Sequence, residues 1–279
     1  MRSATSSMNR TILMMTLLFV PALAHAQAAD DNKGWSFSQR FQGSTNSMGT
    51  VLKETSTATY NFNDHFKAYG GVPFYFTKES GSTGSSSFVN GIGNVYSGLF
   101  ALAGDPSKIR YVSDLSFTLP TGDMTRGFST GHPTVDWTST VVHTFGSFIP
   151  YGSAGIANTM SDTSFFVQPF SVSGFVTHYE AGALFNANSH VGFGGSAYGM
   201  RASGTQQSLT PAKNGNASAQ PGNTPLLIAN DHGFSGWVSL KPNSSTDFQV
   251  GYSRSQEYGL NSLFFGIGFH FGHGISVIK

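Results

Sequence analysis

A strict two-residue alternation near the C-terminus constrains this chain more than any other feature. Between Ser262 and Gly272 every second side chain is large and apolar, and the residues between them are mostly small or polar. Successive side chains of a β-strand point to opposite faces, so the segment would present one wide apolar face and one small or polar face. The apolar row consists of Leu263, Phe265, Ile267, Phe269 and Phe271.

The same alternation recurs along the chain and predicts further strands. It is readable near residues 35–42, 66–77, 110–119, 175–185 and 248–253. Three more segments, near 51–62, 91–104 and 148–160, suit strands but do not fix which face is apolar. Together with the hairpin partners that they imply, these segments predict about twelve strands.

The composition indicates which environment contacts these apolar faces. Charged residues make up only 10% of the chain, against roughly 25% in an ordinary soluble domain. The mean hydropathy is nevertheless only −0.11, so apolar and uncharged polar residues are interleaved. A barrel with lipid outside and a polar lumen has this composition. A secreted soluble β-sandwich is the alternative, but it would need a second sheet over each apolar face.

The connections alternate between short turns and long loops. Short turns rich in Gly, Asn, Asp and Pro are expected at 63–65, 104–107, 146–147, 186–189 and 242–245. Longer Gly/Ser/Thr-rich links are expected at 78–90, 120–132, 161–172 and 204–231. Bacterial barrels have short periplasmic turns and long external loops. The prediction is therefore all-β: a transmembrane antiparallel up-and-down β-barrel of about twelve strands with both termini in the periplasm.

The N-terminus has the features of a cleaved signal peptide. Arg2 and Arg10 precede a short apolar run at 12–20, Pro21 breaks the run, and Ala24-His25-Ala26 fits a cleavage site. The run is shorter than the roughly 20 residues of a membrane-spanning helix. We expect residues 1–26 to be the signal peptide, and residues 27–279 to form one outer-membrane barrel with a long flexible loop at about 204–231.

Three stretches carry a resemblance to a known family. Residues 60–74, which read YNFNDHF and then GGVPF, resemble a "YGLTDRL…GVPF" hairpin. GIGNVYSGL at 91–99 resembles "GxGDVxxGL", and LSFTLPTGD at 115–123 resembles a strand ending in "LPTGD". These are motifs of an outer-membrane β-barrel family that is named for the meta-pathway of phenol degradation. Asn94 stands where the family often has Asp.

The resemblance implies a porin-like transporter of small, hydrophobic or aromatic solutes. It also implies membrane lipid as a partner, and recognition of the C-terminal strand by the barrel-assembly machinery through Phe269 and Phe271. In this chain Phe271 is not terminal, because residues 272–279 follow it. Either Phe271 serves in place, or recognition is relaxed.

Six polar side chains are predicted to face the lumen and are the candidate selectivity residues. A lipid-facing Arg or Lys at mid-membrane costs roughly 2–4 kcal/mol, which favours the inward orientation. These residues could line a pore, or they could form a salt-bridged plug that fills the lumen. They are Arg40, Arg110, Asp114, Asp136, His178 and Glu180.

Large aromatic residues near strand ends suit the two interface girdles of a barrel. Some of them could instead stack on a ligand. The girdle candidates are Trp35, Tyr60, Tyr111, Trp137, Tyr151, Tyr179, Trp237 and Tyr252.

Enzymatic chemistry has little support in the sequence. There is no G-x-S-x-G or H-E-x-x-H motif, so we predict no enzyme, no catalytic residues, no cofactor and no metal site. A barrel phospholipase using His178 or His270 is a minor alternative. The net charge of +1 gives no reason to expect a nucleic-acid partner. A closed structural barrel that makes surface contacts through 204–231 is the remaining alternative to a channel.

Overall fold

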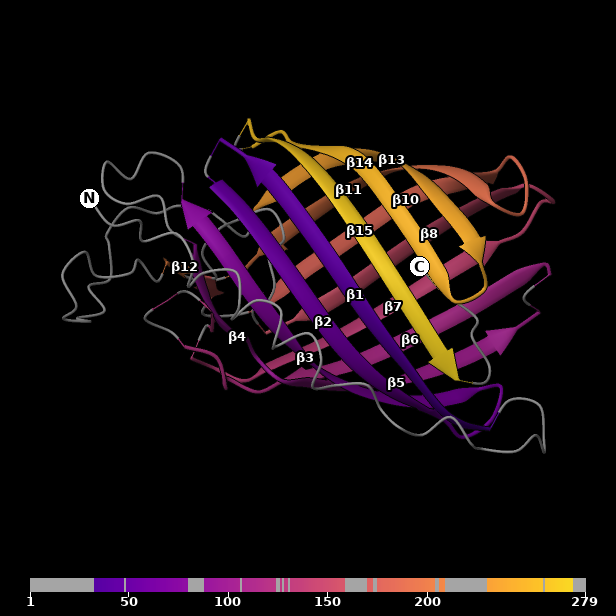
Figure 1. Cartoon of the computed structure of the whole chain (residues 1–279), viewed down its shortest axis with the longest axis horizontal. Coiled ribbons are helices and arrows are strands. Elements are labelled where there is room, and N and C mark those ends of the chain that lie inside the picture. Colours follow the sequence, from indigo (N-terminus) through magenta and orange to yellow (C-terminus); the bar gives the residue numbers. More distant parts are fainter. Residues whose placement is uncertain are drawn as a thin grey trace, which may run out of the picture. The chain divides into compact units, whose positions relative to one another are not determined.

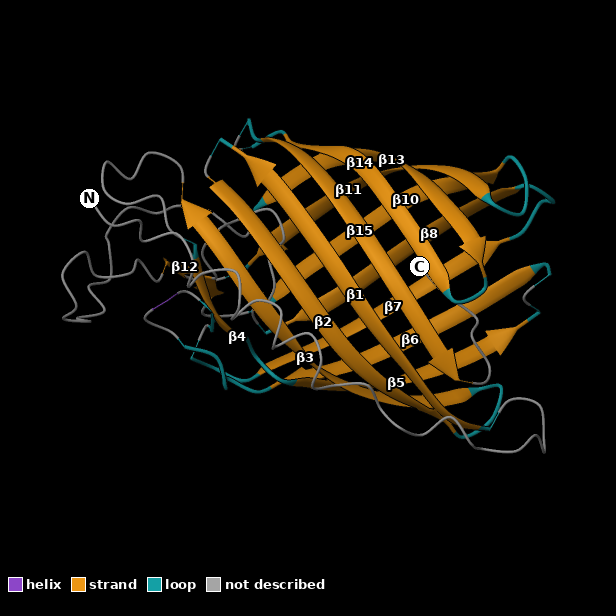
Figure 2. Ribbon diagram, in the orientation of Figure 1, coloured by secondary structure: helices purple, strands orange, loops and turns teal. Residues whose placement is uncertain are grey.

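The computed structural model is a β-structure in which one sheet closes on itself (Figure 1; Figure 2). It describes residues 33–47, 49–79, 88–105, 107–123, 126, 128–129, 131–158, 170–172, 175–203, 206–208, 230–257 and 259–272. The predicted signal peptide at 1–26 lies outside these residues. No helix among the described residues has the length and hydropathy of a membrane span.

Twelve strands form the barrel wall. Their bounds are β1 Gly34–Asn46, β2 Gly49–Asn61, β3 Phe66–Glu79, β5 Tyr96–Gly104, β6 Ile109–Thr118, β7 Thr134–His143, β8 Phe148–Ala157, β10 Val176–Asn186, β11 Val191–Ala202, β13 Asp231–Asn243, β14 Thr246–Ser255 and β15 Asn261–Gly272. Each strand pairs antiparallel with its sequence neighbours in the wall, and β1 pairs with β15. The predicted twelve-stranded up-and-down barrel is confirmed.

Three short strands lie outside this ring. β4 (Val89–Ile92) pairs with the end of β3. β9 (Phe170–Val172) and β12 (Gln206–Ser208) pair with each other in a separate two-stranded sheet. All three lie wholly or partly in segments that the sequence predicted as long loops, so those loops contain some strand structure.

The apolar face points outward, as the alternation predicted. Large exposed apolar side chains occupy outward positions on every strand of the wall except β2, for example Leu99, Trp137, Phe193, Val250 and Leu263. The enclosed side is polar instead, and its most buried side chains include those of Asp231, Asp247, Ser253 and Ser262. The alternative of a soluble β-sandwich is therefore wrong, because no second sheet covers the apolar face in the part of the chain that the structure describes.

The first and last strands close the ring through ten paired positions, from Ser36–Gly272 to Thr45–Leu263. In Figure 1 the indigo β1 runs beside the yellow β15. Phe41 and Phe269 meet edge to face across this closure on the outer side, with ring centroids 6.5 Å apart. The alternating apolar row from Leu263 to Phe271 is therefore the outer face of the closing strand β15.

Turn chemistry explains why the hairpins at one end are short. Asn63 Oδ1 accepts hydrogen bonds from the backbone N–H groups of His65 and Phe66, and Asn188 does the same for His190 and Val191. Side chains that satisfy the turn backbone in this way favour tight connections. Gly146, between β7 and β8, has φ +60°, a left-handed conformation that glycine adopts without steric cost.

Two of the family-like stretches meet at the opposite end of the barrel. Leu119 N–H donates to the Val95 carbonyl, and Gly122 N–H donates to Asn94 Oδ1 over 3.1 Å. The hydroxyl of Thr121 donates to the Gly93 carbonyl over 3.2 Å. An asparagine oxygen thus performs here the acceptor role that an aspartate could perform.

Candidate functional site

The candidate site is the lumen, and the strand register decides which side chains reach it. Residues paired directly across neighbouring strands share a face. Arg40 pairs with Thr55, Asp114 with Thr138, and Glu180 with Ser153. Following these pairs around the ring places all six predicted selectivity residues on the enclosed side. Their role in selectivity is a separate matter and stays a prediction.

Arg40 is held by two residues of β14. Its guanidinium donates to Asp247 Oδ1 and Gln249 Oε1, each over 3.2 Å. Asp247 is 2% exposed and also accepts from His270 Nε2 over 2.6 Å. A buried carboxylate that bonds two cation-forming groups is well satisfied. This arrangement crosses β15 and ties the first strand of the barrel, β1, to its last hairpin, β14–β15.

The sequence analysis missed Asp247, although a signal for it was present. The alternation readable near 248–253 has Phe248, Val250 and Tyr252 on the apolar face and therefore turns Gln249 inward. Asp247 lies two residues before Gln249. The same period would have placed Asp247 in the lumen.

A second group of polar residues lines the wall formed by β6, β7 and β10. His178 Nε2 lies 3.2 Å from Asp136, and the Thr138 hydroxyl donates to the same carboxylate over 2.9 Å. Asp114 accepts from the Tyr69 hydroxyl at 2.9 and 3.1 Å. Structure thus brings His178 and Asp136 together, with Asp114 nearby on β6.

The remaining two candidates have other neighbours. Glu180 accepts from the Tyr151 hydroxyl over 2.7 Å. Arg110 faces the lumen near the short-turn end, close enough to Lys67 for the two cations to repel each other.

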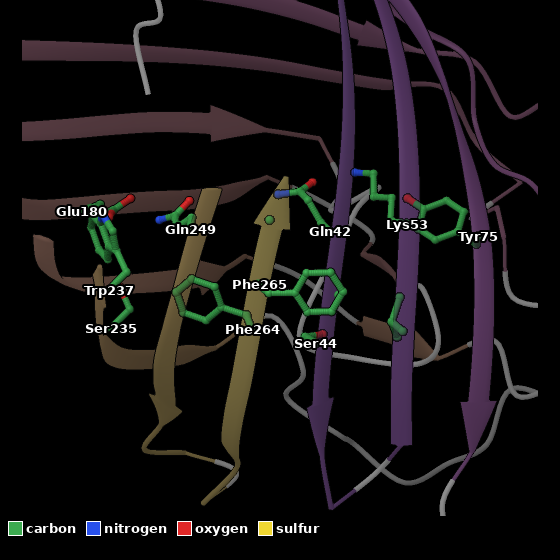
Figure 3. A pocket seen from close by; sticks show the side chains of 13 residues that line it. Gln42, Ser44, Lys53, Tyr75, Glu180, Ser235, Trp237, Gln249, Phe264 and Phe265 are labelled. Carbon is green, nitrogen blue, oxygen red and sulfur yellow. The ribbon is translucent and has the colours of Figure 1, made fainter. Parts of the chain in front are cut away.

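A cavity of about 420 Å³ lies within the lumen (Figure 3). Lys53 of β2 and Glu180 of β10 both line it, and β10 is the sixth strand from β2 in either direction around the ring. The cavity is thus bounded by opposite walls, one carrying a cation and the other a carboxylate. Its other lining residues include Gln42, Ser44, Tyr75, Ser235, Trp237, Gln249 and Phe264.

Aromatic side chains form much of the cavity wall. Trp237 points inward, and its indole covers Gly194 of β11, where an added Cβ would collide with the ring. Its Nε1–H is buried and has no hydrogen-bond partner among the described residues. Lys53 Nζ lies 5.7 Å from the centre of the Tyr75 ring, a cation–π distance.

The girdle prediction is wrong for Trp237 and Tyr151, which face the lumen. The other six face outward, and five of them are clearly exposed: Trp35, Tyr111, Trp137, Tyr179 and Tyr252. Gly236 and Gly152 stand on the outward face beside the two exceptions. A glycine offers no apolar side chain, so the alternation was unreadable at these points.

A charged side chain of β2 lies on the lipid side. β2 turns Lys53 inward and Glu54 outward, since Glu54 pairs with Phe41 and Phe74. Its carboxylate accepts from Gln39 Nε2 over 3.2 Å and from the Ser56 hydroxyl over 2.8 Å. These two polar neighbours partly compensate for the apolar surroundings.

Catalytic and metal chemistry find no support in the described part of the chain. Neither His178 nor His270 hydrogen-bonds a serine hydroxyl there, and both face the lumen rather than lipid. No group of three or more His, Asp or Glu side chains in the described ranges could hold a metal ion.

Comparisons with solved structures agree with this architecture. An outer-membrane channel from Pseudomonas putida F1 matches 88% of this chain and 100% of its own, with 12% identity and a TM-score of 0.59. The NanC porin and the KdgM porin, the latter solved with disordered oligogalacturonate, each match 84% of this chain with a TM-score of 0.50. They are matched over 98% and 99% of their lengths, with 8% and 7% identity.

This chain has the fold of an outer-membrane β-barrel. No protein-family model matches it. No curated protein sequence matches it significantly.

Proposed function

We propose that this protein is an outer-membrane channel for small solutes. The observation that carries the proposal is the cavity inside the closed ring, bounded on opposite walls by Lys53 and Glu180. A lumen lined by opposite charges with uncharged polar groups between them offers a solute replacements for its hydration shell. The apolar outer wall suits a lipid surround, which supports membrane lipid as a partner of the barrel in the outer membrane.

Small aromatic or hydrophobic solutes suit this cavity best. Trp237, Tyr75 and Phe264 supply ring surfaces, while Gln42 and Gln249 supply amide donors and acceptors. Apolar walls with a few polar groups are typical of small-molecule sites. The likeness of three stretches to the family named for the meta-pathway of phenol degradation favours the same class, and kinship with that family is part of the proposal.

Assembly into the membrane would depend on β15. Phe271 is 55% exposed on the outer face of this strand, and Phe269 lies on the same face. We propose that these two rings are read by the barrel-assembly machinery even though residues 272–279 follow them.

Solute-driven swelling of liposomes tests the channel and its preference together. The refolded barrel is expected to admit small aromatic acids faster than sugars of similar mass. Removing an aromatic contact costs about 0.5–1.5 kcal/mol, so Trp237→Ala should lower the ratio of the two rates roughly two- to tenfold. Trp35→Ala, on the outer face, is the matched control and should leave the ratio unchanged.

Two outcomes would contradict the proposal at different levels. No swelling, from protein shown to be folded by a heat-dependent gel shift, would exclude an open channel and leave a closed structural barrel. Swelling with no preference for aromatic acids, in the wild type as in Trp237→Ala, would keep the channel and reject the solute class.

A further inference from the structure

Three basic side chains form a row on the outer wall, at the end of the barrel where the long loops emerge. Arg201 is the last residue but one of β11, His232 is the second residue of β13, and Arg254 is the last residue but one of β14. We define these three as the basic row. The three strands are neighbours in the wall (Figure 1).

The register makes the row continuous. His232 pairs with Gly199, so Arg201 is its diagonal neighbour on one side. Arg254 pairs directly with Phe234, so it is the diagonal neighbour of His232 on the other side. Diagonal Cα atoms lie roughly 7–8 Å apart, within reach of long side chains. One anionic group could therefore contact more than one member.

The row is not neutralised by the described part of the protein. The guanidinium of Arg201 is exposed and forms no hydrogen bond or ion pair there. Arg254 Nη1 donates to Asn261 Oδ1 over 3.3 Å, and the Tyr252 hydroxyl bonds the same oxygen at 2.5 Å. Asp231, next to His232 in the chain, is buried on the enclosed side, where its carboxylate accepts from the Tyr198 and Ser255 hydroxyls. Glu257, three residues after Arg254, forms no ion pair with the row in the described ranges.

An apolar strip continues from the row toward the middle of the barrel. On the same outward faces follow Phe234, Tyr252 and Val250, which are 44%, 37% and 60% exposed. The Phe234 and Tyr252 rings are in contact, with centroids 6.4 Å apart. Cations above an apolar surface match an amphipathic ligand, with its anionic head at the rim and its hydrocarbon chains below.

We propose that the basic row binds the phosphate groups of a phosphorylated lipid in the outer leaflet, whose acyl chains lie on the apolar strip. Arginine suits phosphate because its N–H groups match the phosphate oxygens in pairs. The long-loop end of a bacterial barrel is the external end, so the ligand belongs to the outer leaflet. This inference does not depend on the channel function.

The test is a binding measurement on the purified, detergent-solubilised barrel with a bis-phosphorylated diglucosamine lipid, followed by native mass spectrometry and titration. Each basic residue near an anionic lipid surface contributes about 1 kcal/mol. The triple variant Arg201→Gln, His232→Gln, Arg254→Gln should therefore bind roughly a hundredfold more weakly. A matched triple variant at the other end, Lys33→Gln, Lys108→Gln, Lys241→Gln, should bind like the wild type.

Further arms identify the ligand chemistry. The dephosphorylated lipid should bind the wild type about as weakly as the row variant binds the phosphorylated lipid. Equal binding of both lipids, or equal losses in the two triple variants, would overturn the proposal. Inorganic phosphate that binds as tightly as the lipid would point to a free-phosphate site and would also overturn it. A heat-dependent gel shift verifies that each variant is folded.

Discussion

At the scale of single residues, Asp247 is the side chain on which the lumen network depends most. It is nearly fully buried and bonds both Arg40 and His270. Removing one partner from a buried ionic group leaves the other charge unsatisfied. Because Arg40 keeps some contact with solvent, we expect Asp247→Ala to lower the free energy of unfolding by about 2–3 kcal/mol.

Urea-driven unfolding in lipid vesicles, followed by tryptophan fluorescence, measures this change. Asp64→Asn is the control, because Asp64 is exposed in the turn after β2 and surface changes usually stay within about 0.5 kcal/mol. An Asp247→Ala barrel as stable as the wild type would show that the network contributes nothing to folding.

Replacing Glu54, in contrast to Asp247, is expected to raise the free energy of unfolding. It faces lipid beside Phe41 and Phe74, and its carboxylate is only partly compensated by Gln39 and Ser56. A lipid-facing Arg or Lys costs roughly 2–4 kcal/mol and an acidic residue less. Glu54→Leu should therefore raise the free energy of unfolding by about 1 kcal/mol in the same assay. A loss of stability would mean that the hydrogen bonds of Glu54 with Gln39 and Ser56 stabilise the barrel by more than the lipid-facing carboxylate costs.

At the scale of elements, the short turns fix the hairpin registers. Gly146 has φ +60°, and an added Cβ there would meet no atom within 4 Å. Any cost of substitution is therefore conformational rather than steric. We expect Gly146→Val to destabilise the barrel by about 1–3 kcal/mol and Gly146→Asn to cost clearly less, since asparagine tolerates this region. Equal losses in the two unfolding curves would reject this explanation.

The turn between β5 and β6 offers a titration test. Asp105 accepts from both the hydroxyl and the backbone N–H of Ser107, at 2.6 and 2.8 Å, and these bonds hold the pKa of Asp105 below its usual value. The stability that they contribute is present above the normal aspartate pKa and is lost as pH falls through the lowered one. Ser107→Ala should raise the pKa of Asp105 in an NMR titration. An unchanged pKa would show that the hydroxyl is not responsible.

Sequence predicted elements well where the alternation was clean. The outward row of β15 and the outward positions of β3 were readable because large apolar residues alternate with small or polar ones. β2 was not readable, because its Thr and Ser residues suit either face, and only pairing with β1 and β3 separates Lys53 from Glu54. Trp237 was misassigned for a similar reason, since an isolated tryptophan fits either a girdle or a cavity wall.

At the scale of the whole molecule, charge is distributed unevenly around the lumen. Asp114, Asp136 and Glu180 lie on the wall that runs from β6 through β7 and β8 to β10, which also carries Arg110 near the short-turn end. Arg40 and Lys53 lie on β1 and β2, with Asp247 of β14 bonded to Arg40. The alternation in the sequence predicted that most of these side chains face inward. The alternation does not show which walls face each other, because that depends on the number of strands that close the ring and on the place of each strand in it.

Ion selectivity in planar lipid bilayers tests whether solutes pass through the lumen. If solutes pass through this lumen, the wild-type barrel conducts, and Glu180→Gln lowers the cation-to-anion permeability ratio while Lys53→Gln raises it. Glu54→Gln removes a charge beside Lys53 in sequence but on the lipid side, so it should leave the ratio unchanged. A folded, inserted barrel that does not conduct, or a ratio that responds to Glu54 and not to Glu180, would contradict the account.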